Sequence, residues 1–175
     1  MSVIRQASTV DSHNIAELHI LSWRNTYSGI LPDDYLAKII VGERHDYWQQ
    51  ALSNSKSDGF VLLIPGDSLP LAFSSVRHSG EAGYDALLDN LHVHPEYKSQ
   101  GLGREILGAT LDRLLTEGAR SLCLWVFDAN VATVKFYERL GGRADQHGMD
   151  DFVGSQAPHT RYGWRDLDQL RERCR

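Results

Sequence analysis

Cysteine is scarce in this chain, and no long apolar run interrupts its mixed composition. Its two cysteines, Cys123 and Cys174, are too few among 175 residues for a disulfide framework, which favours a reducing compartment. The apolar runs at residues 60–64 and 122–127 are far too short to cross a bilayer, and the first residues lack the apolar core of a signal peptide. These features predict a cytoplasmic protein that is not embedded in a membrane.

Positive charge is also in short supply. The formal net charge is −5 and the computed pI is about 5.9, so the chain lacks the basic footprint of a nucleic-acid-binding protein. The length suits one α/β domain that is large enough to bury a core. We therefore expect a single domain over residues 1–175 that binds no nucleic acid.

Strand and helix patterns alternate along the chain and predict a sheet that is first antiparallel and then joined by helical crossovers. The apolar run at 121–127, between two amphipathic helices, is typical of a central parallel strand. The predicted strands are residues 3–7, 60–64, 71–78, 84–93, 121–127, one near Arg143, and 159–164. The predicted helices are residues 9–27, 33–40, 43–52, 103–118 and 130–140. A loop is predicted over residues 148–158.

The segment Lys98-Ser-Gln-Gly101-Leu-Gly103 joins a predicted strand to a long amphipathic helix. Two glycines at a helix start let backbone amides approach an anion, and the helix dipole adds partial positive charge. A Walker loop requires Gly-Lys, which is absent here, and a dinucleotide fingerprint would have its third glycine at Ile106. A diphosphate cradle made by amides from Lys98 to Gly103, with charge from Lys98 and Arg104, is a third interpretation. A tight turn that binds nothing is a fourth.

Two segments resemble motifs of the GCN5-related N-acetyltransferases, the GNAT superfamily. LDNLHVHPEYKSQGLGREIL resembles the acetyl-CoA signature of that family, in which Arg or Gln is followed by x-x-Gly-x and then Gly or Ala. DANVATVKFYERLGG resembles its later motif, in which an Asn begins a helix that carries Phe-Tyr and ends in Leu-Gly. Both occur in the family's order and spacing. Lys98 departs from the pattern, because it keeps the charge of Arg but lacks the planar fork.

The resemblance implies an α/β GNAT fold, with a central twisted mixed sheet of six to seven strands and helices on both faces. It also implies acetyl-CoA as the cosubstrate. In that family the strand before the loop presents its backbone to the pantetheine arm, the next strand splays away, and an amide near Leu91 polarises the thioester carbonyl. The residues implied in binding acetyl-CoA are Leu91, His92, Val93, Lys98, Ser99, Gln100, Gly101, Leu102, Gly103, Arg104 and Asn130.

The resemblance further implies which residues move protons. Tyr137 falls on the family's tyrosine and is the predicted general acid, although Phe136-Tyr137 also fits an aromatic pair on a packing face. Leu87 occupies the position at which many members carry a glutamate base. Asp89 shares its strand face by alternation and is the predicted base, directly or through a water, with a solvated acid as the alternative. His92 alternates to the opposite face, and an amine that arrives as the free base needs no base.

A metal site and a covalent intermediate are both disfavoured by the residues present. His92 and His94 form an i, i+2 pair of the kind that can share a cation, but no third ligand has convincing spacing, so we predict no metal. Cys123 lies within an apolar strand and is a poor candidate nucleophile. Direct attack of an amine on the thioester, which the resemblance implies, agrees with this.

Aromatic residues of the N-terminal helices are candidates for the acceptor site, because these helices form one wall of it in the family. Trp23 and Tyr27 lie four residues apart on one helix face, where they line the acceptor pocket or pack with Leu31 and Leu36. Acidic residues either attract a cationic amine or lie in solvent, and they are Asp33, Asp34, Asp89 and Asp150.

The resulting hypothesis is acetyl-CoA-dependent acetylation of the primary amine of a small molecule. The alternatives that stay open are a protein N-terminal or lysine acetyltransferase, a non-catalytic acyl-CoA sensor or partner-binding module, and a nucleotide-binding oxidoreductase. The resemblance also implies that residues 148–164 contribute to the acceptor site or to a homodimer contact.

Overall fold

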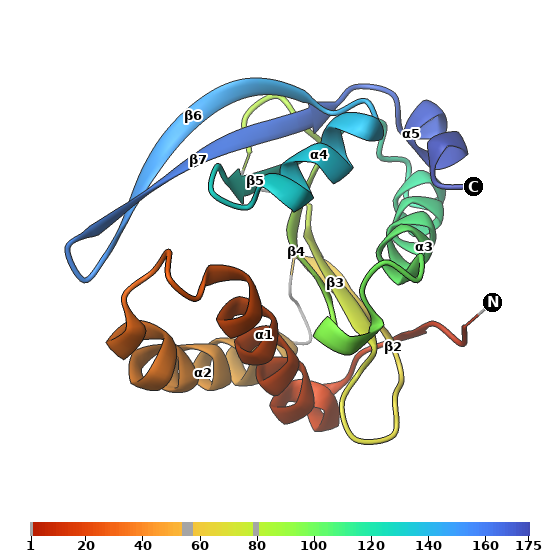
Figure 1. Cartoon of the computed structure of the whole chain (residues 1–175). Coiled ribbons are helices and arrows are strands. Elements are labelled where there is room, and N and C mark those ends of the chain that lie inside the picture. Colours follow the sequence, from red (N-terminus) through yellow and green to blue (C-terminus); the bar gives the residue numbers. More distant parts are fainter. Residues whose placement is uncertain (1, 54–57, 79–80) are drawn as a thin grey trace.

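Seven strands form one mixed sheet in the computed structural model, which describes residues 2–53, 58–78 and 81–175 (Figure 1). The order across the sheet is β1-β2-β3-β4-β5-β7-β6, and β4 and β5 are its parallel neighbours. The strands are β1 (Arg5–Gln6), β2 (Gly59–Ile64), β3 (Ala72–Arg77), β4 (Ala86–Val93), β5 (Leu122–Phe127), β6 (Arg143–Phe152) and β7 (Ser155–Trp164). The helices are α1 (Ser12–Tyr27), α2 (Ile40–Ser53), α3 (Leu102–Thr116), α4 (Val131–Arg139) and α5 (Leu167–Arg173). Shorter helical turns are η1 (Thr9–Asp11), η2 (Tyr35–Ile39) and η3 (Pro95–Tyr97).

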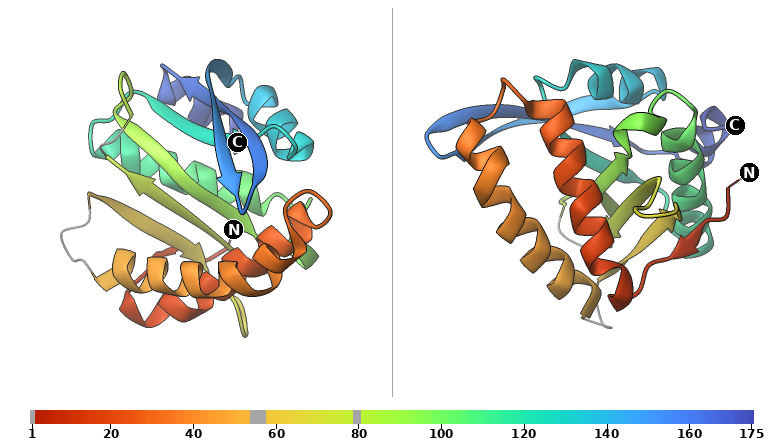
Figure 2. Two further views of the ribbon diagram at one scale, coloured as in Figure 1. Left: turned by 90° about the vertical axis from the view of Figure 1, so that its left-hand side faces the viewer. Right: turned by 60° about the horizontal axis from the view of Figure 1, so that its bottom comes forward.

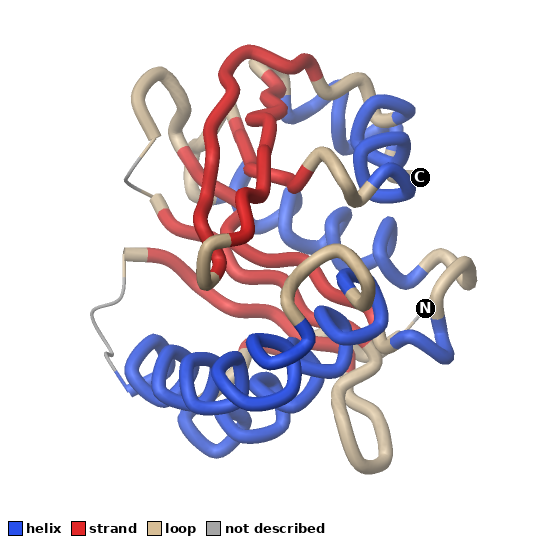
Figure 3. Tube along the Cα trace, turned by 60° about the vertical axis from the view of Figure 1, so that its left-hand side comes forward, coloured by secondary structure: helices blue, strands red, loops and turns tan. Residues whose placement is uncertain are grey.

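Helices cover both faces of the first four strands, as predicted. α1 and α2 pack side by side on one face (Figure 3), where Leu18 and Trp48 meet Leu63 and Phe73. α3 covers the opposite face together with α5, and both chain ends lie on that side (Figures 1 and 2). None of the helices in the described ranges is long and apolar enough to cross a membrane.

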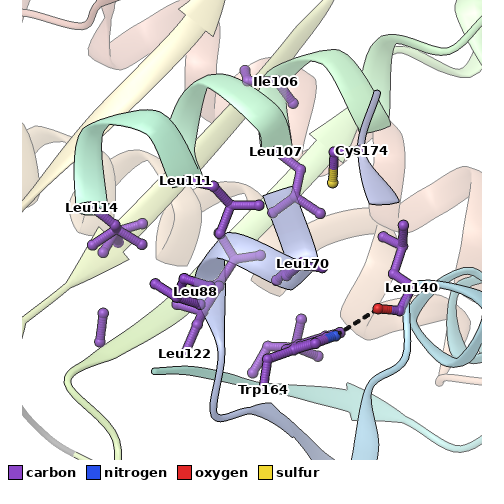
Figure 4. Close-up of a cluster of buried hydrophobic side chains, with 14 of the residues drawn as sticks. Leu88, Ile106, Leu107, Leu111, Leu114, Leu122, Leu140, Trp164, Leu170 and Cys174 are labelled. Atoms are coloured by element: carbon purple, nitrogen blue, oxygen red, sulfur yellow. Dashed lines mark hydrogen bonds between the residues drawn. The ribbon is translucent and has the colours of Figure 1, made fainter. Parts of the chain in front are cut away.

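The apolar stripe predicted for α3 forms part of the largest core cluster. Its buried members are Ile106, Leu107, Leu111 and Leu114. Each leucine contributes about 1.5–3 kcal/mol relative to an exposed side chain. Figure 4 shows these residues packed near α5 and Trp164, whose Nε1 donates to the carbonyl of Leu140 at 3.0 Å. Gly118, with φ of +91°, ends the helix as predicted, because glycine adopts that left-handed conformation without a steric penalty.

β4 and β5 pair only at their first residues and then diverge. The parallel register joins Ala86 to Leu122 and Leu87 to Cys123, and no later pair forms between these two fully described strands. β5 is held instead by β7, which pairs with it as far as Phe127. The edge of β4 from residue 88 onward therefore has no neighbouring strand on the β5 side, as the predicted splay requires.

A bulge in β4 lies at Asp89. Consecutive residues of β3 pair with Leu88 and with Asn90, so Asp89 is an extra residue between them. A bulge of one residue shifts the alternation of side chains along the rest of the strand. Leu88 and Leu91 both belong to the core under α3, although they lie three residues apart.

The helices predicted at 33–40 and 43–52 are not separate. η2 continues into α2 without a break, so one helical segment covers both predictions. Gly42 lies inside this segment. A glycine costs a helix only about 1 kcal/mol, which tertiary packing of the buried Leu36, Ile40 and Trp48 outweighs.

The prediction of a loop over residues 148–158 is wrong, because the chain there forms the end of a long hairpin. β6 and β7 pair without interruption from Gln146 with Arg161 to Phe152 with Ser155. The turn between them is Val153-Gly154, with φ of +53° and +81°, and two left-handed residues are the favoured connection of a two-residue hairpin. Most side chains of β6 are exposed, so apolar alternation did not mark this strand. Helix α5 was also missed, because its seven residues are too few for a clear period.

Candidate functional site

A cavity of about 1180 Å³ lies where β4 and β5 diverge. Its walls come from β4, β5, α4, the start of α3 and the second half of α1. A smaller cavity of about 500 Å³ lies between α1, α2 and the end of the β6–β7 hairpin. The two cavities adjoin, since they share the lining residues Trp23, Asp89, Asn90, Trp125, Phe127 and Asp150.

The backbone of β4 offers hydrogen-bonding groups to the larger cavity. The amide of His94 donates to the carbonyl of Leu71 at 2.8 Å, so the backbone of every second residue before it also points toward β3. Leu91 and Val93 therefore present their amides and carbonyls to the opposite edge, which β5 has left. Leu91, His92 and Val93, which the sequence predicts to meet the pantetheine arm, all line this cavity.

Five consecutive backbone amides precede the first bonded turn of α3. They belong to residues 99–103, and within the described chain none donates a hydrogen bond to another residue. Ser99 and Gly101 have φ of +64° and +88°, and such left-handed residues turn successive amides toward a common concavity. A Cβ at Gly101 would meet no atom within 4 Å. The amide of Lys98 is not in this set, because it bonds the carbonyl of Pro95 at 3.4 Å.

The long side chains around this loop take different directions. Lys98 donates from Nζ to Asn25 Oδ1 at the end of α1 at 2.8 Å, and burial lowers its pKa. Arg104 lines the larger cavity. Gln100 does not line it, and its Nε2 instead donates to the carbonyl of Glu96 at 3.5 Å. All the residues predicted to bind acetyl-CoA except Gln100 thus border one cavity.

α4 brings Asn130 and Tyr137 to another wall of the same cavity. Asn130 caps the helix, because its Oδ1 accepts from the amide of Thr133, and its Nδ2 donates to the hydroxyl of Tyr27, both at 3.3 Å. Tyr137 is buried, and its ring packs 5.9 Å from that of Trp164. Burial raises the pKa of Tyr137, and the nearby Tyr27 adds to the rise. The phenol therefore keeps its proton at neutral pH.

The bulge in β4 puts Asp89 and His92 on the same face, so the prediction that His92 faces away from Asp89 is wrong. Asp89 Oδ2 accepts from the hydroxyl of Tyr47 on α2 at 2.6 Å, and Oδ1 accepts from Arg77 at 2.7 Å. His92 Nδ1 lies 3.0 Å from Ser22 Oγ on α1. Alternation by two assumes an uninterrupted strand, and one extra residue reverses its phase.

Comparison with known proteins decides the family. A family model described as the acetyltransferase (GNAT) family matches residues 14–142. The chain belongs to the GNAT family. YuaI, an uncharacterized N-acetyltransferase of Bacillus subtilis, is 31% identical over 173 residues, which cover 98% of this chain and 97% of that protein. The spermidine N(1)-acetyltransferase of Thermoplasma acidophilum is 26% identical over 156 residues, covering 86% and 93% respectively.

Solved structures share the fold of this GNAT protein. PaiA N-acetyltransferase from Thermoplasma acidophilum, in complex with coenzyme A, has a TM-score of 0.72 at 24% identity and covers 91% of this chain and 98% of its own. YncA from Salmonella typhimurium, with its cofactor acetyl-CoA, has a TM-score of 0.66 at 18% identity and covers 96% and 95%. The predicted family and fold are confirmed, and the chain is an N-acetyltransferase, which is a type of acyltransferase.

Two histidines at the contact between α1 and β4, His19 and His92, are neutral in this GNAT protein. Burial lowers the pKa of His92 to about 3, and the positive charges of Lys98 and Arg44 add to the fall. The ring of His19 lies 4.3 Å from that of His92, and burial lowers its pKa as well. Trp48 donates to Nδ1 of His19 at 3.1 Å, which leaves the ring proton of His19 on Nε2.

His92 and His94, the pair considered as metal ligands, each interact with another group of the protein. His94 Nδ1 accepts from the amide of Glu96 at 3.3 Å, and His92 contacts α1. Among the described residues, one group of three side chains brings metal-binding atoms within 4.8 Å of one another, and it consists of His13, Glu17 and His45. This group lines neither cavity.

Trp23 and Tyr27 both pack in the core and line a cavity, which are the two arrangements that the sequence left open. Their ring centroids lie 5.2 Å apart, and Tyr27 is buried in a cluster with Leu31 and Leu36 against which Trp23 packs. Both residues also line the larger cavity, and Trp23 lines the smaller one too. Of the acidic candidates, Asp89 and Asp150 line both cavities, whereas Asp33 and Asp34 line neither.

Several cavity residues could not be identified from the sequence. Arg44 and Tyr47 reach the smaller cavity from α2, and Trp125 and Phe152 reach it from β5 and the end of β6. They meet only because α2 and the β6–β7 hairpin converge, and no local motif marks any of them. The one signal was the aromatic content of these segments, which fits core packing equally well.

Cys123 is buried within β5. Burial raises the pKa of its thiol to about 12. A thiol that stays protonated at neutral pH is a poor nucleophile, as the sequence predicts.

Proposed function

We propose that this GNAT protein transfers the acetyl group of acetyl-CoA to the primary amine of a small molecule. The observation that carries the proposal is the pair of adjoining cavities, one bordered by the unpaired edge of β4 and the loop amides, the other by aromatic and acidic side chains. The solved relatives that contain coenzyme A or acetyl-CoA support the choice of donor. The relative named for spermidine supports a small amine as the class of acceptor.

In this proposal the donor binds along the splayed edge of β4. The five amides of residues 99–103 hold its diphosphate at the start of α3, where the helix dipole favours negative charge. The backbone groups of Leu91 and Val93 bond the pantetheine arm as an added strand would. Arg104 and Lys98 supply positive charge, and Asn130 bonds the arm from the side of α4.

The amine approaches from the smaller cavity, past Trp23 and Tyr27, and attacks the thioester carbonyl directly. A carbon–nitrogen bond forms, the carbon–sulfur bond breaks, and the amide of Leu91 stabilises the charge on the carbonyl oxygen. Tyr137 gives its proton to the departing thiolate, a role that suits a phenol whose pKa is raised by burial. Cys123 contributes no thiolate, so no covalent enzyme intermediate is needed.

Asp89 is the proposed base and acts through a water molecule. It lines both cavities and therefore lies beside the path of the amine. Its Oδ1 accepts one hydrogen bond from Arg77 and keeps a lone pair for a water. His92, with a pKa of about 3, is too weak a base for this step at neutral pH.

The setting of the reaction is part of the same proposal. We propose one domain over residues 1–175, supported by the single sheet that all described strands join. The cytoplasm is the proposed compartment, supported by the free, buried thiols of Cys123 and Cys174. We also propose that residues 148–164 form a homodimer contact. The proposed reaction involves no nucleic acid, membrane or metal.

Steady-state kinetics with acetyl-CoA and a panel of amines tests the proposal, with thiol release and product mass as readouts. We expect turnover with at least one small amine. For Tyr137→Phe we expect kcat to fall about 100-fold or more at an unchanged Kd for acetyl-CoA, because only the acidic proton is lost. Tyr162→Phe is the matched control, since that buried tyrosine lines neither cavity. Binding of acetyl-CoA without turnover of any amine would instead support the sensor alternative.

A further inference from the structure

Arg44 occupies an unusual position in the smaller cavity. It extends from α2, and its guanidinium carbon lies 5.7 Å from the ring centroid of Trp23 and 5.6 Å from that of Tyr47. Its side chain is only 22% exposed. Two aromatic rings therefore hold a positive charge in a largely enclosed place, where its position is restricted.

No described residue accepts a hydrogen bond from this guanidinium. Its Nε is buried and has no partner within the described residues. Its one ion-pair contact there is Glu43, 3.6 Å from an Nη atom, and the same carboxylate oxygen already accepts from the hydroxyl of Tyr35 at 2.8 Å. A buried Nε–H without a hydrogen bond is unfavourable, because this donor has left water without a replacement.

Several other arginines of this chain are bonded to carboxylates. Arg77 bonds Asp89 at 2.7 Å, and Arg161 bonds Asp145 at 2.8 Å and Glu81 at 2.9 Å. Arg44 differs from them because it faces a cavity. It is also the one Arg or Lys among the described residues that line the smaller cavity.

Apart from Glu43, the acids that line this cavity contact groups other than Arg44 within the described residues, and Asp150 lies 3.5 Å from Nδ1 of His159. Asp89 is held by Arg77 and Tyr47, and Asp151 accepts from the amide of Gly154 at 2.7 Å. None of these acids turns toward Arg44 as a bonded partner. Among the described residues that line this cavity, Arg44 is thus the one cation, and its donors are available to an anion.

We infer that Arg44 binds a carboxylate of the acceptor, so that the preferred acceptor class is an amine that also carries a carboxylate, as amino acids do. This inference rests on the proposed acetyl transfer. The planar fork of arginine matches a carboxylate in two parallel hydrogen bonds, and the rings of Trp23 and Tyr47 restrict where the fork can lie. With the carboxylate held by Arg44, the amine extends past Trp23 toward the larger cavity, since Trp23 lines both.

Matched acceptor pairs test the inference. Lysine is compared with cadaverine, which is lysine without its carboxylate, and several amino acids are compared with their amides. We expect kcat/KM to favour the carboxylate of each pair by at least about 10-fold, a typical effect of one charge-assisted contact. Arg44→Gln removes this preference mainly through KM, and Arg44→Lys, which keeps the charge without the fork, restores it only in part. Lys38→Gln is the control, because it removes a nearby exposed charge that lines neither cavity.

A binding measurement separates failure of this inference from failure of the proposed function. The same pairs are titrated calorimetrically into the coenzyme A complex of the wild type and of Arg44→Gln, where no turnover is required. A carboxylate preference in Kd that Arg44→Gln abolishes supports the inference, whether or not acetyl transfer is found. Equal affinity for each acid and its amide, or a preference that survives Arg44→Gln, overturns it and leaves acetyl transfer to other amines untouched.

Discussion

One extra residue, Asp89, determines which side chains of β4 share the acceptor side of the sheet. Because of this bulge, Asp89 and His92 both face α1 and α2, although simple alternation separates them. The glycine loop and Tyr137 could be predicted from the sequence, because each belongs to a motif of adjacent residues. Arg44 and Tyr47 could not, because their importance depends on what α2 packs against.

At the scale of single residues, the proposal that Asp89 is the base predicts that Asp89→Asn lowers kcat much more than Arg77→Gln does. Asp89→Asn keeps a side chain of the same shape but removes the proton acceptor, so kcat at neutral pH is expected to fall about 100-fold or more. Arg77→Gln removes the ion-pair partner and leaves the carboxylate in place, so its effect is expected to stay within about 10-fold. Steady-state kinetics at saturating acetyl-CoA measures both. Equal losses in the two variants would make Asp89 a structural partner of Arg77 rather than a base.

At the scale of elements, α1 and β4 are joined through the neutral histidines His19 and His92. The folded-state pKa of His92 is about 3, below the ordinary value of 6.5, so the unfolded chain takes up a proton first as the pH falls. This contribution to stability is therefore complete above about pH 6.5 and is lost toward lower pH. His19 acts in the same direction, because burial also lowers its pKa.

The expected consequence is acid destabilisation of the contact between α1 and β4. From about pH 7.5 to about pH 5.5, His92 alone should reduce the free energy of unfolding by about 1 kcal/mol. Urea unfolding at the two pH values measures this loss, and His92→Gln should show a smaller one. His13→Gln, which changes an exposed histidine of α1, should keep the loss of the wild type. An identical pH dependence in His92→Gln would show that His92 is not the group responsible.

Elements differed in how far the sequence could predict them. α3 and β5 have strong apolar patterns and were predicted nearly to their ends, because each buries a wide apolar face. The β6–β7 hairpin was missed in part, because its outer half is polar and is stabilised by pairing along its length and by the contact of Phe152 with Trp23 and Tyr35. Such long-range contacts leave no local period in the sequence.

At the scale of the whole molecule, the site forms where two parts of one sheet separate. The first four strands, with α1 and α2, supply the edge of β4, and the last three strands, with α4, supply the opposite wall. Only two residue pairs join β4 to β5, so the opening is a property of the sheet rather than of any one side chain. The start of α3 closes one end of this opening with the amides of residues 99–103.

Binding of the diphosphate of acetyl-CoA by these amides can be tested with two matched glycines that flank α3. Gly101 and Gly118 flank the helix with φ of +88° and +91°, and a Cβ on either would meet no atom within 4 Å. Alanine should therefore cost each site a similar 1–2 kcal/mol or so of backbone strain. Only Gly101 borders the cavity.

The decisive measurement is calorimetric titration of acetyl-CoA into the wild type, Gly101→Ala and Gly118→Ala. We predict that Gly118→Ala binds with the Kd of the wild type, whereas Gly101→Ala binds at least about 10-fold more weakly, a loss of about 1.4 kcal/mol. The same Kd in all three proteins, or no binding by the wild type, would contradict the account.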